Sequence, residues 1–248
     1  MIDGGYVASS LGRIGDLASG TGSVTVTSGT WANASNLYIG DSGKGSLLVN
    51  GGLVSSAESR IANEVGAVGS VVVSSGTWQS SGSLLVGNKG TATLTITGGL
   101  VTSAMTQAAV DGSGHGTLNL NGGVLQTRTV NGGLGVAALS FDGGTLRATG
   151  NHGGFIAGFG GGVTLHAGGA VIDSNGFEVG VSVQLTGTGG LTKLGAGLLA
   201  LSGSSDYTGA TVVEAGTLQI NGGLYGNGTV TVKDGATLGG TGEIAGYV

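Results

Sequence analysis

The chain of 248 residues is rich in glycine and poor in charge: 58 residues are glycine, 8% are charged, and cysteine and proline are absent. Without cysteine there is no disulfide, no thiolate metal site and no thiol nucleophile. A net charge of −5 with eight dispersed basic residues argues against a nucleic-acid surface, which needs clustered lysine and arginine.

The hydropathy pattern separates the chain from disordered and membrane-spanning proteins. Mean hydropathy is +0.35, whereas disordered chains are typically poor in hydrophobic residues and rich in charge. No apolar run approaches roughly 18 residues, so no membrane helix and no membrane insertion are expected. The N-terminal stretch MIDGGYVASSLGRIGDLASG lacks the apolar core of a signal peptide, so we expect a mature or excised segment if the protein is secreted.

Residues 1–21 are weakly patterned, and we expect a lead-in segment, a degenerate coil or an N-terminal cap there. After them, residues 22–54 and 69–101 repeat one sequence at a distance of 47 residues. The recurring residues include Gly22 and Gly69, Trp31 and Trp78, and Gly40 and Gly87. A fixed period of this size indicates stacked repeats that bury their apolar faces against their neighbours.

The 47-residue unit contains two half-repeats, because GSVTVTSGTW at 22–31 matches GSLLVNGGLV at 45–54, 23 residues later. Apolar residues alternate at i and i+2, which is the periodicity of strands and not of helices. The leading inward pairs are Val24/Val26, Leu47/Val49, Val71/Val73, Leu94/Ile96, Leu118/Leu120, Leu139/Phe141, Val163/Leu165, Val183/Leu185 and Val230/Val232.

In the first half-repeat we expect strands at 23–27, 30–32 and 37–39, separated by a turn at Ser28-Gly29 and a polar loop at 33–36. A circuit of three short strands can pair each strand in parallel with the equivalent strand of the next circuit, about 4.8 Å away. The predicted fold is therefore all-β: a right-handed parallel β-helix of roughly ten coils and about 50 Å.

Glycine is expected at the corners of the coils, because it reaches positive φ at little steric cost. Proline is absent, as expected for a ladder that is paired on both sides. The predicted glycine column is Gly29, Gly52, Gly76, Gly99, Gly123, Gly144, Gly169, Gly190, Gly216 and Gly235.

The chain is interpreted as one continuous solenoid domain with regular coils at 22–125, less regular coils at 126–188 and further coils at 189–248. In the middle segment, Phe141, Phe155, Ile156 and Phe159 would be exposed in a linker, which favours continued coils.

Residues 189–222 read GGLTKLGAGLLALSGSSDYTGATVVEAGTLQING and resemble the autotransporter-associated β-strand repeat. Leu198, Ser205-Asp206 and Ala210 depart from the usual residues of that repeat. The residues that match it are Gly189, Gly190, Leu191, Thr192, Lys193, Gly195, Gly197, Leu199, Leu201, Ser202, Gly203, Tyr207, Thr208, Gly209, Thr211, Val213, Gly216, Thr217, Leu218 and Gly222.

The resemblance implies a fragment of an autotransporter (type V secretion) passenger domain from a Gram-negative cell. Such a passenger lies at the cell surface or is released, and the translocating barrel of the family has no counterpart in this sequence before Val248. In that family the repeat is associated with secretion and with folding outside the cell.

The stretch Gly40-Asp41-Ser42-Gly43 resembles the nucleophile motif of chymotrypsin-like proteases, some of which are autotransporters. A serine nucleophile needs a histidine base, and in that family the histidine precedes the serine. His115, His152 and His166 all follow Ser42, and the stretch recurs without serine as Gly87-Asn88-Lys89-Gly90. We therefore interpret it as a turn of the repeat.

No other candidate site is favoured over a structural interpretation. The three histidines lack the converging spacing of metal ligands, and GGFIAGFGGG at 153–162 lacks the acids of calcium-binding repeats. The acids expected at different points of the circuit, and so not clustered as in a polysaccharide enzyme, are Asp111, Asp142, Asp173, Glu178 and Asp206. We expect no catalytic residue, no metal ligand and no cofactor.

Trp31 and Trp78 share one position of the circuit with Val54, Val101, Leu125 and Leu146, which favours an interior role over an outward pair that stacks on sugars. A mixed column should face outward: Thr25, Leu48, Val72, Thr95, Asn119, Ser140, Thr164, Gln184 and Thr231. It lacks the uniform threonines of an ice-binding face, and Leu48 with Val72 would offer a small apolar contact patch.

Three functions remain open. The first is a non-catalytic adhesin or structural rod that binds a host surface protein or glycan, or other copies of itself. The second is a polysaccharide-active enzyme, and the third is a secretion-and-folding module without a ligand. The dispersed acids favour the first and third.

Overall fold

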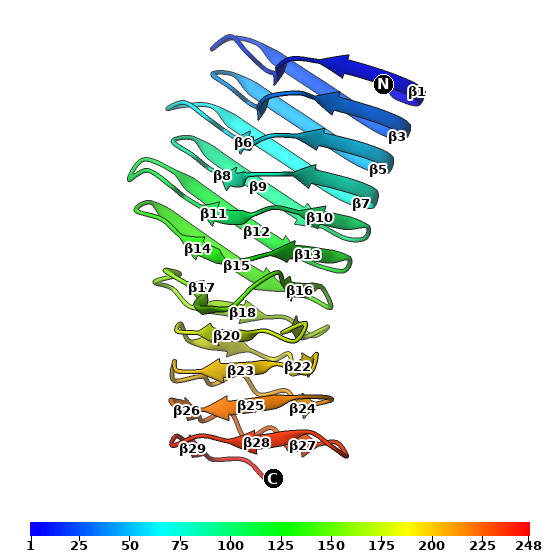
Figure 1. Ribbon diagram of the computed structural model, residues 1–248. Helices are drawn as coiled ribbons and strands as arrows, with labels where there is room; N and C mark the ends of the chain where they lie inside the picture. Colours follow the sequence, from blue (N-terminus) through cyan, green and yellow to red (C-terminus); the bar gives the residue numbers. More distant parts are fainter.

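The computed structural model describes residues 1–248 and consists of strands and turns, with no helix. The chain winds into coils that stack in chain order from the N-terminus to the C-terminus (Figure 1). Strands of neighbouring coils pair in parallel, as in β9 with β12 and β23 with β25. The predicted all-β solenoid is therefore confirmed.

One side of the solenoid is an eleven-stranded parallel sheet, to which each coil contributes one strand. We number the coils 1 to 11 by these strands, where roughly ten had been expected. In order they are β2 (Gly12–Ile14), β4 (Leu37–Ile39), β6 (Ser59–Ile61), β8 (Ser83–Val86), β11 (Met105–Ala108), β14 (Val130–Gly132), β17 (His152–Ala157), β20 (Glu178–Val181), β23 (Leu198–Leu201), β25 (Thr217–Ile220) and β28 (Thr237–Gly239).

The other strands form a sixteen-stranded sheet and one small pair. The long strands of the sixteen-stranded sheet are β1 (Ile2–Ser9), β3 (Thr21–Asn33), β5 (Lys44–Ser56) and β7 (Val68–Ser80). After β7 it divides into two flanks. The first flank is β9 (Thr91–Ile96), β12 (His115–Leu120), β15 (Val136–Phe141), β18 (Val163–Leu165) and β21 (Leu185–Gly187). The second flank is β10 (Leu100–Thr102), β13 (Val124–Thr127), β16 (Thr145–Ala148), β19 (Ala170–Asp173), β22 (Leu191–Leu194), β24 (Thr211–Val213) and β27 (Val230–Val232). The small pair is β26 (Gly223–Leu224) and β29 (Glu243–Ile244).

The strands expected at 23–27 and 30–32 in the first half-repeat are one continuous strand, β3, which corrects the prediction of a separating turn. Gly29 lies inside β3 with φ of +75°, so the strand bends at this corner without ending. Pairing continues on both sides of the bend, as in Val26 with Val49 and Thr30 with Leu53. From β9 onward the corner separates two strands, as predicted.

The interior is mostly apolar, with 48 buried hydrophobic residues in one cluster. Val71 pairs with Leu94, which pairs with Leu118, and all three lie almost fully buried. Val73 is 0% exposed, whereas Val72 is only half-buried on the outer face. The predicted inside and outside assignment of these strands is thus confirmed.

The tryptophans point inward, as predicted. Trp31 and Trp78 are 7% and 0% exposed, and Val54 lies between them in the paired register. This interior column continues through Val101, Leu125, Leu146, Ile172, Lys193 and Val213. A large side chain thus alternates with a small one in its first three positions.

The 47-residue period has a second structural cause, the length of the turn that leaves the eleven-stranded sheet. Turns of six residues at 15–20, 62–67 and 109–114 alternate with turns of four residues at 40–43 and 87–90. One long-turn coil and one short-turn coil together make the sequence repeat. The equivalent unit of the fold is therefore a pair of coils.

The predicted strand alignment is wrong in the C-terminal third. The second flank includes Thr211–Val213 and Val230–Val232, which had been aligned with the first flank. Gly216 and Gly235 therefore lie at the corner between the second flank and the eleven-stranded sheet, where Gly195 also lies, and not at the corner of Gly29. Val163 pairs with Leu185, not with Val183, and Thr186 replaces Gln184 and Thr231 in the outward column. The physical reason is that second-flank strands start only 19 to 21 residues apart here, at Ala170, Leu191, Thr211 and Val230. First-flank strands shorten in the same coils, until only a single bridge joins Ser205 to Leu224.

Candidate functional site

The protease-like stretch at 40–43 is a turn of the solenoid, as interpreted from the sequence. The buried carboxylate of Asp41 accepts a hydrogen bond from the Asn63 amide at 2.8 Å. The Asn88 amide donates in turn to Asn63 Oδ1 at 3.0 Å, so the three side chains form a ladder across successive turns. Asp41 also lies 3.4 Å from the Arg13 guanidinium.

The histidines lie in later coils than Ser42. The turn that holds Ser42 leads into β5 at Lys44, and Lys44 is separated from His115 by Val68 and Thr91 in the paired register. Three strand spacings are about 14 Å, which is beyond hydrogen-bond reach. His152 and His166 are further along the stack.

The acidic residues lie at different points of the circuit, as predicted. Asp111 is in a turn, Asp142 follows β15 and Asp206 follows the bridge at Ser205. Asp173 ends β19 and accepts a hydrogen bond from Arg147 Nε at 2.8 Å, and Glu178 begins β20. No group of three histidine, aspartate or glutamate side chains lies close enough together to hold a metal ion. The chain forms no helix with the length and hydropathy that a bilayer crossing requires.

A buried lysine is the feature that the sequence interpretation missed. Lys193 occupies the interior column between Ile172 and Val213 and is 0% exposed. Its spacing of 21 residues from Ile172 is the sequence signal for this position.

The ammonium of Lys193 connects three coils. Nζ lies within hydrogen-bond distance of four oxygens, so two of them share one of its three N–H groups: Ser174 Oγ at 2.9 Å in coil 8, the Leu194 and Gly195 carbonyls at 2.9 and 2.7 Å in coil 9, and the Ala215 carbonyl at 3.0 Å in coil 10. Burial lowers the pKa of Lys193 to about 8, while the charge of Asp173 acts in the opposite direction. The Gly195 and Ala215 carbonyls accept from no other group. Lys193 is therefore a structural contact of this repeat.

Tyr207, in the segment between β23 and β24, is a second buried polar residue of this repeat. Its hydroxyl lies 2.6 Å from Thr211 Oγ1, and the side chain is 1% exposed. Burial raises the pKa of Tyr207 to about 12. Lys193 and Tyr207 are thus two hydrogen-bonded polar side chains in the buried interior of this repeat.

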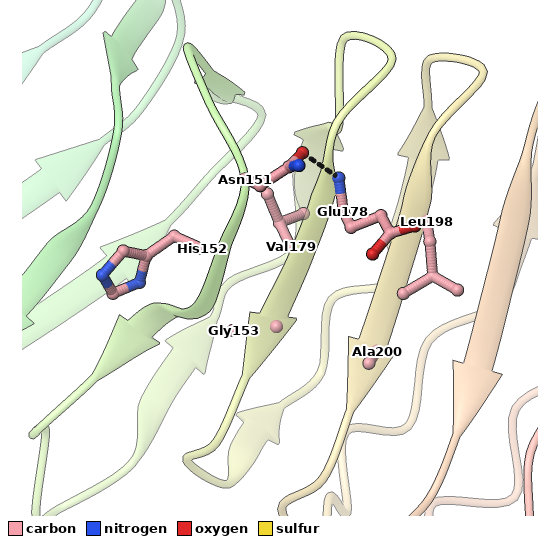
Figure 2. Close-up of a pocket in the computed structure, with 8 residues that line it drawn as sticks. Asn151, His152, Gly153, Glu178, Val179, Leu198 and Ala200 are labelled. Atoms are coloured by element: carbon pink, nitrogen blue, oxygen red, sulfur yellow. Dashed lines mark hydrogen bonds between the residues drawn. The ribbon is translucent and has the colours of Figure 1, made fainter.

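Three adjoining depressions on the outer face of the eleven-stranded sheet share one residue, His152. Their volumes are about 320, 390 and 350 Å³. We call them together the His152 groove, and Figure 2 shows the depression between β17, β20 and β23. The other groove residues that carry polar side chains are Gln107, Arg128, Thr129, Asn131, Asn151 and Glu178.

A bulge in β17 produces the groove. His152 pairs with Val179 and Ile156 with Val181, so four steps of β17 oppose two steps of β20. Gly153 and Gly154 lie in the extra length, while Phe155 turns into the core and is 0% exposed. Bulges of this kind re-aim side chains and interrupt strand pairing.

Hydrogen bonds hold the edges of the bulge. Thr129 Oγ1 lies 3.1 Å from the Gly154 carbonyl oxygen, and the Glu178 backbone N–H donates to Asn151 Oδ1 at 3.0 Å (Figure 2). The Gly154 N–H donates to His152 Nδ1 at 3.2 Å. In the neutral imidazole the proton is therefore on Nε2, which is left free to donate.

One family of known proteins matches a segment of the C-terminal coils. The family described as passenger-associated-transport-repeat matches residues 191–220, which form β22 to β25 and contain Lys193 and Tyr207. This match confirms the resemblance noted at 189–222. No solved structure matches the chain.

Two curated proteins are similar over short segments. An autotransporter named adhesin BmaC, from Brucella suis biovar 1 (strain 1330), is 43% identical over 68 residues, which are 27% of this chain and 2% of that protein. An extracellular serine protease of Serratia marcescens is 42% identical over 66 residues, which are 27% of this chain and 6% of that protein. The chain spans only a small part of the length of either relative. It is a β-solenoid that resembles autotransporter passengers and carries a passenger-associated transport repeat in its ninth and tenth coils.

Proposed function

We propose that this chain acts as a non-catalytic rod within an autotransporter passenger, outside the cell, and that its side faces serve adhesion. The observation that carries the proposal is the continuous stack of coils that contains the transport-associated repeat. A solenoid of this kind distributes its stability along its length and presents long surfaces for binding.

The two relatives support a structural contribution to larger proteins. Their names differ, one an adhesin and one a protease, yet each shares a segment with this chain at nearly the same identity. What such segments have in common is better explained by a scaffold than by one catalytic activity. The name of the adhesin favours adhesion as the role of the exposed faces.

A small apolar patch suits contact between copies of the chain. Leu48 and Val72 are paired neighbours on the outer face, and both are half-buried. Their neighbours in the outward column, Thr25 and Thr95, carry no charge that would oppose the approach of a second rod. We therefore propose weak self-association there, in addition to adhesion to host surfaces.

The test is display of residues 1–248 on a bacterial surface, with the same carrier without the chain as the control. We expect faster settling of displaying cells and stronger attachment to host-cell monolayers. A Leu48→Lys, Val72→Lys variant should lose the settling and keep the attachment, while Thr164→Lys with Thr186→Lys, a paired outward site four strands from Val72, serves as the matched control. Resistance of the displayed chain to protease establishes that each variant is folded. Equal settling and equal attachment with and without the chain would overturn the proposal.

A further inference from the structure

We propose that the His152 groove is a binding site for a neutral, hydroxyl-rich oligosaccharide. The inference rests on the proposed adhesive function and names a ligand class for it. The groove crosses strands β11 to β23, which is four strand spacings or about 19 Å. A shallow site of this length suits an extended chain of several units and not a single small molecule.

The floor of the groove lets a ligand approach the backbone. Gly132, Gly153, Gly154, Gly158 and Gly180 line it. Backbone of neighbouring strands takes up the side-chain positions of Gly132, Gly158 and Gly180, whereas Gly153 and Gly154 leave theirs accessible. A methyl group added at Gly153 would meet no atom within 4 Å, so the space above this residue is open. Glycine in a strand interior commonly marks such a close approach.

The walls offer both hydrogen-bond donors and acceptors. The amides of Gln107, Asn131 and Asn151 supply both, and His152 Nε2–H adds a donor beside them. A hydroxyl group also donates and accepts, so a chain of hydroxyl groups can bind to such a set in several registers. Apolar surface for the C–H faces of a ligand comes from Met105, Leu198 and Ala200.

The charges favour a neutral ligand. Arg128 borders the depression beside Met105, and Glu178 borders the depression beside Leu198. Neither residue takes part in an ion pair, whereas Arg13, Arg60, Lys89 and Arg147 all do. One free cation and one free anion near opposite ends leave no net charge to attract a polyanion, and the chain as a whole carries −5.

The test measures binding to the purified 248-residue chain by titration calorimetry and NMR. The probes are cellohexaose and hexa-N-acetylchitohexaose as neutral chains, a hyaluronan hexasaccharide as an anionic chain, and an uncharged decapeptide. We expect at least one neutral hexasaccharide to bind at least 10-fold more tightly than the anionic chain and the peptide. Preferential binding of the anionic chain or of the peptide, or no binding of either neutral chain, would overturn the inference.

Two variants locate the site. Gly153→Leu should fill the groove and weaken binding at least 10-fold with an unchanged melting temperature, because its φ is not in the positive region and the space is open. His152→Ala with Asn131→Ala should weaken binding by a similar factor. The matched controls are Gly112→Leu, which is also unobstructed but lies in a turn, and His115→Ala; both should bind like the wild type. Wild-type affinity in the groove variants would refute this location.

Failure of the inference is separable from failure of the proposed function. If the purified chain binds no neutral oligosaccharide while displaying cells still attach, the groove assignment is wrong and adhesion stands. If the purified chain binds through the groove but displaying cells do not attach, the site stands and the adhesive role is wrong.

Discussion

Replacing Lys193 tests whether its side chain fills the core as well as holding the corner carbonyls. In Lys193→Ala the three carbon groups beyond Cβ and the ammonium are lost, whereas Lys193→Met keeps a chain of nearly the same volume. Both variants leave the Gly195 and Ala215 carbonyls without a donor. The difference between the two variants therefore isolates the buried stem.

The expected difference follows from the burial. The side chain is 0% exposed, and burial of a methylene group contributes about 0.8 kcal/mol, so three groups account for about 2–3 kcal/mol. An unfilled cavity would increase this value, because substitutions of long apolar residues by alanine cost about 2–5 kcal/mol. We expect the free energy of unfolding of Lys193→Ala to be at least about 2 kcal/mol lower than that of Lys193→Met.

Two measurements check this expectation. Urea denaturation followed by circular dichroism gives the free energy of unfolding, and hydrogen exchange with mass spectrometry shows where protection is lost. Because coils contact only their neighbours, the loss should concentrate in β19 to β25. Lys233→Ala, at an exposed lysine, is the matched control. Equal stability of Lys193→Ala and Lys193→Met, or loss of protection mainly in coils 1–4, would refute the reasoning.

Three further predictions follow from burial and backbone geometry. The pKa of Lys193 is lowered to about 8 from 10.5, so between these pH values the folded chain binds fewer protons than the unfolded chain. The free energy of unfolding should therefore rise from pH 8 to pH 10, and Lys193→Met should lack this rise. Above pH 10 the raised pKa of Tyr207, about 12, should lower the free energy of unfolding as the pH rises, so the unfolding midpoint should be measured only up to pH 10. Val73→Asp should cost at least about 4 kcal/mol because it buries an unpaired carboxyl, whereas Val72→Asp on the outer face should stay within about 0.5 kcal/mol; the reverse order in thermal denaturation would contradict the strand orientation. Gly40 and Gly66 both have positive φ, but an added Cβ at Gly40 would lie 2.3 Å from the Val68 carbonyl oxygen and at Gly66 would meet no atom within 4 Å. Gly66→Ala should cost about 1–2 kcal/mol and Gly40→Ala clearly more, and similar melting temperatures would argue against this turn geometry.

The regular coils could be predicted from sequence because two signals agree there. Alternating apolar residues such as Val71 and Val73 assign one face of a strand to the core, and the 47-residue period assigns each strand a neighbour. The structure confirms both for residues 22–125.

The C-terminal alignment could not be obtained in the same way. A strand, a glycine corner and a second strand occur at two different corners of each coil, so the segment 211–220 matches either of them. Only the pairing of Leu191 with Thr211 decides between the two. The coils in this region are shorter and lack a long first-flank strand, whose alternating apolar residues would have distinguished the two corners in the sequence.

The His152 groove depends on a feature that leaves no periodic signal. Around Gly153 and Gly154 the sequence is glycine-rich, and the bulge arises because Phe155 and Ile156 are both buried. Sequence reasoning placed His152 and Glu178 as isolated residues, and their positions along one groove come from the stacking of coils 7 and 8. Lys193, in contrast, could have been placed from its spacing to Ile172.

The pairing of coils described for the N-terminal half has a genetic consequence. Tryptophan alternates with valine in the interior column, and six-residue turns alternate with four-residue turns. Unequal recombination between copies can therefore lengthen or shorten the gene by one 47-codon unit, and each coil at the new junction then packs against the same kind of coil as before. Exchange by a single coil would set tryptophan against tryptophan or a long turn against another long turn. Natural variants of this region should accordingly differ in length by steps of two strand spacings, about 9.6 Å.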